Sequence, residues 1–153
     1  MHLTLTDKLR REVDRYRNKE FLKAVLAVCA IAARANPTIS LEARFRIDRI
    51  LDRVDLVELF DRDKVTRILN DYIHWLTADR VLAGAVLHAK VARMAGDRKK
   101  ARTLLRVAYL VMSAGEMMTA GEHAELDRLC RLLALDPATV TGTLRPAAYS
   151  LPP

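Results

Sequence analysis

Residues 25–50 read VLAVCAIAARANPTISLEARFRIDRI, and residues 104–129 repeat their plan as LLRVAYLVMSAGEMMTAGEHAELDRL. Each segment contains an apolar helix, a short loop, a Ser or Thr that can cap a helix, and a second helix. At an offset of 79 residues Ser40 aligns with Thr119, and the tetrapeptide IDRI aligns with LDRL. The correspondence predicts an internal helix-loop-helix duplication, with halves at about residues 21–53 and 100–132. The two equivalent loops are where such a protein would hold a ligand.

The composition favours an all-α protein with one hydrophobic core. Of the 153 residues, 51% are hydrophobic but only 5% are aromatic, so Leu, Val, Ile, Ala and Met must fill the core. Apolar residues recur with a helical period almost throughout, and no stretch alternates as a half-buried strand would. We therefore expect a single-domain bundle of seven to eight helices over residues 1–142, followed by a flexible tail at 143–153.

Two helices are expected before the first loop. The first spans about residues 5–18, because four apolar residues fall on one face at helical spacing: Leu5, Leu9, Val13 and Tyr16. The second runs through FLKAVLAVCAIAARA and should end near Asn36-Pro37, since a residue before proline leaves the helical region.

Capping residues place the later helices. A long helix is expected to run to Ala95, where Gly96 would adopt the left-handed conformation that stops a helix. Thr119 and Glu122 have the spacing of a capping box, which satisfies two backbone N–H groups at a helix start. The other predicted caps and breaks are Ser40, Asp55 or Asp61, the Thr77-Ala78-Asp79 break, Asp97, and the Asp136-Pro137 start of a last short helix.

No segment indicates export or insertion into a membrane. The longest apolar run, AVLAVCAIAA, is about half of the roughly 20 residues that span a bilayer, and no apolar signal region follows the first charges. Cys29 and Cys130 fall on apolar helix faces and are interpreted as buried small hydrophobic residues. The chain is expected to be soluble and cytoplasmic.

Positive charge is concentrated in one predicted hairpin. The chain carries a net charge of +7, and residues 80–113 contain eight basic residues and one acidic residue. Five of the bases are predicted to form a stripe for an anionic partner: Lys90, Arg93, Arg98, Arg102 and Arg106. An acidic protein or an anionic membrane surface would fit this stripe, and a solvated helix face is the alternative. Nucleic acid is not expected, because Tyr109 is the only aromatic residue among these bases.

Catalytic motifs are missing from the sequence, so we do not expect an enzyme. There is no GxSxG, no phosphate-binding glycine loop and no HExxH, and no catalytic residue is predicted. His74, His88 and His123 are isolated in sequence, and an enzyme would need a polar cleft that joins one of them to a carboxylate. Glu122, His123 and Glu125 are spaced to ligate a metal from one turn, but the capping box explains Glu122 better.

Four segments follow one another along the predicted helices: VDRYRNKEFLKAVLAVCAIAA (13–33), LFDRDKV (59–65), AGAVLHAKVARMAGDRKKARTLLRVA (83–108) and LCRLLALDP (129–137). In the order and spacing of these segments the chain resembles the family of the tellurite-resistance protein TerB over about residues 13–140. The resemblance implies a seven-helix bundle of two related halves without enzymatic activity. It also implies a part in bacterial stress and tellurite-resistance systems near the inner membrane, and divalent-cation binding through two acidic loops.

The acidic loops of the family are not preserved in this chain. Asn36 stands where the first loop's pattern has Asp, and Met117 stands where the second loop has an acid. Calcium takes six to eight oxygen ligands, several of them charged. Three acidic residues remain near the loops, and they also serve helix starts: Glu42, Glu116 and Glu122. We therefore expect no metal and no other cofactor, with residual divalent-cation binding as the alternative.

Together these features predict a non-enzymatic TerB-like interaction module of a stress or tellurite-resistance system. Its basic stripe, or the groove between its loops, would bind a protein partner or an acidic membrane surface. This would place the protein in the cytoplasm or peripherally at the inner membrane. The alternatives are a residual divalent-cation-binding TerB protein, and a protein whose basic face binds an anionic membrane or nucleic acid.

Overall fold

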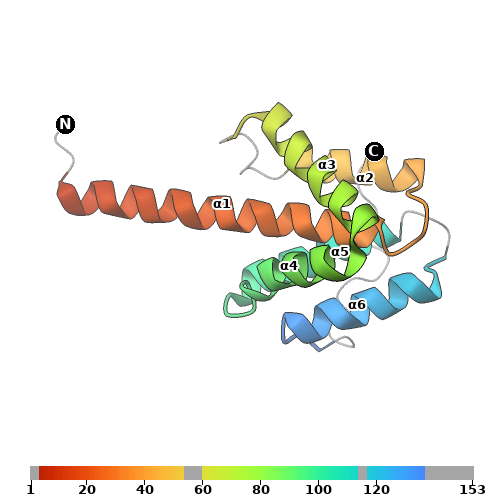
Figure 1. Ribbon diagram of the computed structural model, residues 1–153. Helices are drawn as coiled ribbons and strands as arrows, with labels where there is room; N and C mark the ends of the chain where they lie inside the picture. Colours follow the sequence, from red (N-terminus) through yellow and green to blue (C-terminus); the bar gives the residue numbers. More distant parts are fainter. Residues whose placement is uncertain (1–3, 54–59, 114–116, 137–153) are drawn as a thin grey trace.

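The computed structural model describes residues 4–53, 60–113 and 117–136, and all the regular structure within them is helical (Figure 1). Six helices lie within these described ranges: α1 (Leu5–Ala33), α2 (Leu41–Arg53), α3 (Arg62–Ala78), α4 (Arg80–Ala92), α5 (Arg98–Met112) and α6 (Ala120–Leu132). The prediction of an all-α fold is confirmed. The alternative cap Asp55, the predicted short helix from Pro137 and the tail at 143–153 lie outside the described residues.

α1 is a single helix of 29 residues, so the prediction of two helices before the first loop is wrong. No Gly or Pro interrupts residues 5–33, and the polar stretch RNKE between the two apolar segments consists mainly of good helix formers. The helix starts at a capping box, in which the Asp7 amide donates to Thr4 Oγ1 at 3.1 Å. It ends at Ala33, before the predicted stop at Asn36-Pro37.

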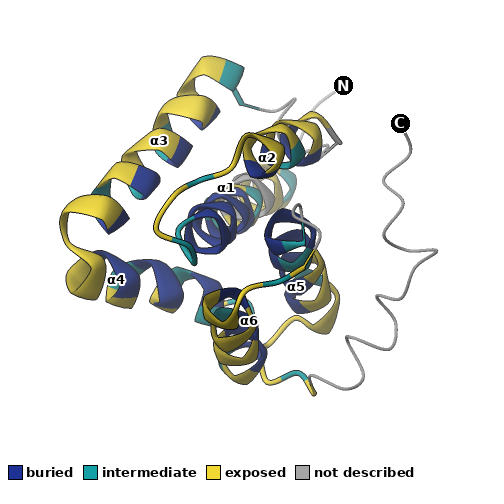
Figure 2. Cartoon of the chain, turned by 90° about the vertical axis from the view of Figure 1, so that its right-hand side faces the viewer, coloured by how far each residue is buried: buried dark blue, intermediate teal, exposed yellow. Residues whose placement is uncertain are grey.

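The C-terminal half of α1 is the central element of the bundle. From Phe21 to Ala33 every residue except Lys23 is buried. Figure 2 shows this part of α1 enclosed by the other helices. A surrounded helix needs apolar residues on all sides, which explains the nearly continuous apolar run of this segment.

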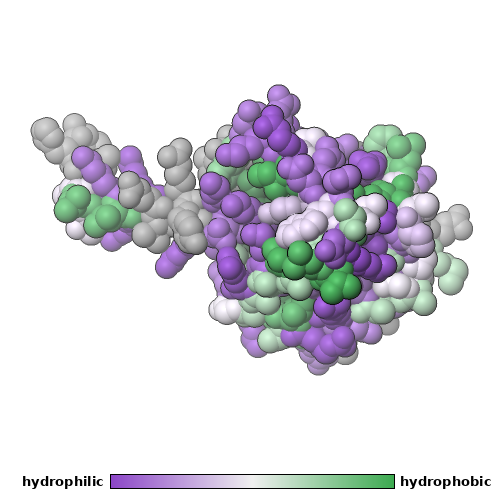
Figure 3. Space-filling model, in the orientation of Figure 1, coloured by the Kyte–Doolittle hydropathy of each residue, from purple (hydrophilic) through white to green (hydrophobic). Residues whose placement is uncertain are grey.

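The N-terminal half of α1 projects from the bundle (Figure 1). Leu5 and Leu9 are 75% and 54% exposed, so this part of the predicted apolar stripe is not covered by the described chain. Figure 3 shows apolar surface among hydrophilic side chains along the projection. Although α1 is long, neither it nor any other described helix is apolar over enough of its length to cross a membrane.

The predicted caps of the helices that follow are present. At the start of each of α2 to α6, a side-chain oxygen accepts a hydrogen bond from a backbone N–H group of the first turn. The residues that supply this oxygen are, in chain order, Ser40, Asp61, Asp79, Asp97 and Thr119. Asp79 also ends α3, so α3 and α4 join at one residue, as the predicted break at this position requires.

The end of α4 differs from the prediction. The helix stops at Ala92 rather than Ala95, and the next residues close through short turns, with the Ala95 amide donating to the Ala92 carbonyl at 3.1 Å. Gly96 has no positive φ, so it is not a left-handed stop. Among the described residues a left-handed conformation occurs instead at Ala134, with φ of 55°, directly after α6.

Candidate functional site

The two loops that align in the sequence lie side by side in the structure. The hydroxyl of Thr119, at the start of α6, donates to Asn36 Oδ1, in the loop after α1, at 2.7 Å. In the same region a Cβ built on Gly121 would lie 2.8 Å from the Ala35 carbonyl oxygen, which is closer than real Cβ atoms approach. The glycine therefore allows the first turn of α6 to rest against the backbone of the first loop.

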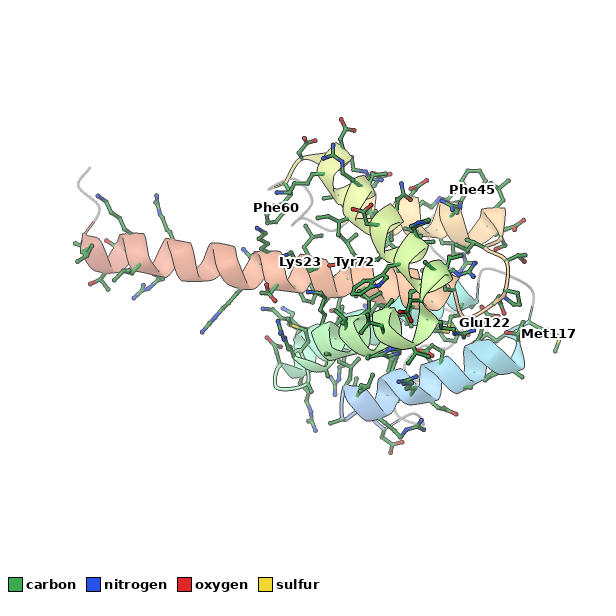
Figure 4. The ribbon with its side chains drawn as sticks, viewed as in Figure 1. Lys23, Phe45, Phe60, Tyr72, Met117 and Glu122 are labelled. Carbon is green, nitrogen blue, oxygen red and sulfur yellow. The ribbon has the colours of Figure 1, made fainter. Side chains whose placement is uncertain are left out.

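A groove of about 160 Å³ lies between the loops, and we call it the interloop groove. Its polar lining consists of Asn36, Thr38, Ser40, Thr119 and Glu122, and the rest of the described lining is apolar. Figure 4 shows Met117 and Glu122 at the end of α6 that meets the loops. The groove is thus small, and its oxygen atoms are mostly neutral.

Glu122 is the carboxylate in this lining, and it is only 5% exposed. Its Oε1 accepts the Thr119 backbone N–H at 2.9 Å, while Thr119 Oγ1 accepts the Glu122 N–H at 3.1 Å. The predicted capping box is therefore confirmed. The buried carboxylate is already engaged at the start of α6.

The described residues of the interloop groove do not fit a calcium site. Calcium needs six to eight oxygens, several of them charged, and this lining offers one carboxylate that is already hydrogen-bonded. Glu42 is exposed in the first turn of α2 and is not part of the lining, and Glu116 lies outside the described residues. In the part of the chain that the structure describes, no three His, Cys, Asp or Glu side chains gather closely enough to hold a metal.

The five residues of the predicted basic stripe do not share one environment. Arg98, Arg102 and Arg106 are exposed, follow each other at a spacing of four residues on α5, and so lie along one face of the helix. We call these three residues the α5 arginine row. Lys90 is half-buried in the last turn of α4. Arg93 forms an ion pair with Glu20 of α1, with Nη1 3.4 Å from Oε2.

The α5 arginine row has no counter-ion in the described residues, where the ion pairs of α4 and α5 involve other side chains. Lys100 on the same helix lies 4.0 Å from Asp97 and places its Nζ over the Phe21 ring, 5.5 Å from the centroid. The basic residues near α1 therefore stabilise the bundle, while the arginine row remains open to solvent. The contacts of Arg93 with Glu20 and of Lys100 with Phe21 join residues far apart in the sequence, so local spacing does not indicate them.

One histidine that is isolated in sequence has a carboxylate partner in the structure. His88 of α4 is buried, and its Nε2 lies 2.5 Å from Glu125 Oε1 of α6, while its Nδ1 lies 2.6 Å from the Gly84 carbonyl oxygen. His74 and His123 are exposed. Sequence reasoning missed this pair because its members lie 37 residues apart. Each ring nitrogen of His88 has a hydrogen-bond partner in the described structure.

Comparison with known proteins gives a partial similarity to TerB. Over 67 residues the chain is 31% identical to the tellurium resistance protein TerB of Alcaligenes sp., which corresponds to 44% of this chain and 55% of that protein. The chain thus spans about half the length of the curated relative that it matches. No protein-family model and no solved structure matches the chain. The similarity points towards the TerB family without covering the whole of either protein.

Proposed function

We propose that this chain is a TerB-like, non-enzymatic interaction module that binds an acidic protein partner through the α5 arginine row. The observation that carries the proposal is the exposure of Arg98, Arg102 and Arg106 on one helix face without a counter-ion among the described residues. Exposed guanidinium groups attract carboxylates and can bind them through two parallel hydrogen bonds. The partial similarity to TerB supports a role in a bacterial stress or tellurite-resistance system.

The proposal includes an internal duplication of one helix-loop-helix unit. α1 and α5 end at Ala33 and Met112, and α2 and α6 span residues 41–53 and 120–132, so each pair of boundaries differs by 79 residues. The buried positions of α2 and α6 follow the same offset. They are Ala43, Ile47, Ile50 and Leu51 in α2, and Glu122, Leu126, Leu129 and Cys130 in α6. One structural plan used twice accounts for both observations.

The proposal also includes loss of the cation site that the resemblance to TerB implies. Ala43 in the first half is small and apolar, and its counterpart Glu122 is engaged in a capping box. A cation that binds only the native state stabilises it by about 2.7 kcal/mol at 100 times its Kd and so raises the melting temperature. Because we propose that the site is lost, titration with Ca²⁺ or Zn²⁺ should leave the melting temperature unchanged. A stabilising shift that Glu122→Gln removes would contradict the loss.

Two triple variants with the same loss of charge test the arginine row. The first is Arg98→Gln/Arg102→Gln/Arg106→Gln, and the control is Arg44→Gln/Arg49→Gln/Arg67→Gln, which removes three exposed arginines of α2 and α3. A partner retained by the tagged wild-type protein from its native host should be lost with the first variant and kept by the control. Retention by the wild type should fall as salt is raised, since exposed charges are screened.

The same variants separate the alternative partners. If both triple variants retain the partner equally, the α5 arginine row does not bind the partner and is only a solvated helix face. Sedimentation with phosphatidylserine vesicles that depends on the row would favour the membrane surface, and a gel shift with duplex DNA would favour nucleic acid. Growth of a deletion strain on tellurite tests the resistance role independently of any partner.

A further inference from the structure

A second, larger pocket lies on another part of the bundle. It has a volume of about 470 Å³ and is formed where the end of α1 meets the first half of α4 and the middle of α6. We call it the α4–α6 pocket. Its volume falls within the range of about 300–1,000 Å³ that is typical of small-molecule sites. It shares no lining residue with the interloop groove or with the α5 arginine row.

Three arginines from separate parts of the chain line this pocket: Arg34 directly after α1, Arg80 at the start of α4 and Arg128 on α6. Arg80 and Arg128 are exposed, and their side chains have no ion pair or hydrogen bond within the described residues. Arg34 Nη1 donates to the Pro37 carbonyl at 3.2 Å, and a guanidinium group has further N–H donors to offer. The lining therefore includes basic side chains from three separate parts of the chain, and basic side chains attract anions.

The single carboxylate among the described lining residues does not cancel this charge. His88 Nδ1 lies 2.6 Å from the Gly84 carbonyl, which can only accept, so Nδ1 carries a proton and donates it. His88 Nε2 lies 2.5 Å from Glu125 Oε1, so this carboxylate is hydrogen-bonded to the imidazole rather than to an arginine. Three arginines outnumber the one carboxylate in the described lining, so positive charge remains for an anion.

The rest of the lining is apolar. Ile31 and Leu76 are buried, Gly84 and Ala85 are small residues that leave room along α4, and Val81 is 85% exposed. Figure 3 shows apolar surface over the start of α4. An exposed valine beside unpaired arginines favours a ligand with both an apolar group and a negative charge.

We propose that the α4–α6 pocket binds a small organic phosphate, with the phosphoryl group at Arg34, Arg80 and Arg128 and the apolar group against Ile31, Leu76 and Val81. A phosphate monoester carries about two negative charges near pH 7, so it balances three arginines better than a single carboxylate does. Arginine also binds phosphate oxygens through two parallel hydrogen bonds. The same chemistry is present in a soluble phosphate ester and in the head group of a phosphorylated lipid.

The test measures binding of phenyl phosphate to the full chain by calorimetry and by amide chemical shifts. The wild type should bind phenyl phosphate saturably, with shift changes at Gly84, Ala85 and Glu125, and should bind inorganic phosphate more weakly. Arg80→Gln/Arg128→Gln should weaken binding at least tenfold, because each arginine supplies charged hydrogen bonds to the phosphate. Arg44→Gln/Arg49→Gln removes the same charge from exposed positions of α2 and should bind as the wild type does.

Two further measurements decide the remaining outcomes. Ala85→Phe keeps every arginine but fills space along α4, so it should also weaken phenyl phosphate binding. If phenyl phosphate does not bind, vesicles containing phosphatidic acid that bind the wild type and not Arg80→Gln/Arg128→Gln would assign the phosphate to a lipid. Failure of both ligands to bind, or equal binding by the pocket variant and the α2 variant, would overturn the proposal.

Discussion

Replacing Gly121 by Ala tests whether the two loops are held in contact. The added Cβ would lie 2.8 Å from the Ala35 carbonyl oxygen, whereas ordinary contacts of a Cβ begin at 3.4 Å. Either the start of α6 or the first loop must therefore move by about 0.6 Å. Neither moves freely, because Thr119 is fixed by its capping box and by the 2.7 Å hydrogen bond to Asn36.

The expected cost combines two opposing effects. Overpacking typically destabilises by about 1–3 kcal/mol, and replacing a helical glycine by alanine returns up to about 1 kcal/mol. Gly121→Ala should thus lower the free energy of unfolding by about 1–2 kcal/mol. Gly96→Ala is the matched control, because no atom lies within 4 Å of the added Cβ and the residue has no positive φ. It should be neutral or stabilise by up to about 1 kcal/mol, through reduced entropy of the unfolded chain.

Urea unfolding followed by circular dichroism gives both values from the transition midpoints, provided that the slopes agree with that of the wild type. The two variants should differ by about 2 kcal/mol, which for a chain of this size corresponds to roughly 4–8 °C in Tm. If Gly121→Ala proves as stable as Gly96→Ala, the loops are not in contact in solution. The interloop groove would then have no fixed shape.

Three further predictions concern single side chains. Thr119→Ala should lower the free energy of unfolding, measured in urea, by about 1–2 kcal/mol, because the hydroxyl caps α6 and also donates to Asn36. Thr119→Ser should retain most of the stability, and a change near zero in Thr119→Ala would mean that α6 does not begin there. Ala134→Gly should raise the same free energy by about 0.5–1 kcal/mol, since alanine at φ of 55° is strained where glycine is not; a loss of stability would contradict the left-handed end of α6. Burial raises the pKa of the Cys29 thiol to about 12, and burial together with the charge of Asp127 raises the pKa of the Cys130 thiol to about 11. Both thiols should therefore react slowly with a disulfide reagent in the native protein from pH 8 to 10, and rapidly in urea, where a thiol ionises near pH 9. Rapid labelling of the native protein would refute this burial.

The sequence predicts the helices well where local signals control them. Asp61, Asp97 and Thr119 cap helices as expected, because a capping interaction depends on residues two or three positions apart. The predicted break between two helices near residue 19 is wrong because a polar stretch is not by itself a signal that ends a helix. Without Gly or Pro the backbone of α1 continues through this stretch, and the helix projects from the bundle.

The sites depend on contacts between distant parts of the chain, and local spacing gives little sign of these contacts. His88 meets Glu125 across 37 residues, and Asn36 meets Thr119 across 83. Gly121 could have been noticed, because its counterpart at the offset of 79 is Glu42, and a glycine in the first turn of a helix suggests a close approach of backbone. Its partner, the Ala35 carbonyl, could not have been identified without the fold.

The two aligned helices α2 and α6 use the same position for different purposes. Arg46 in α2 donates through Nη1 to the Leu110 carbonyl at 3.1 Å, so it ties α2 to the end of α5. Its counterpart at the offset of 79 is Glu125 in α6, which binds His88 of α4. Under the proposed duplication, this one position carries a base that binds α5 in the first half and an acid that binds α4 in the second half. The two halves can therefore share one plan while a pocket lined by arginines forms beside α6, where Glu125 binds His88 rather than the arginines.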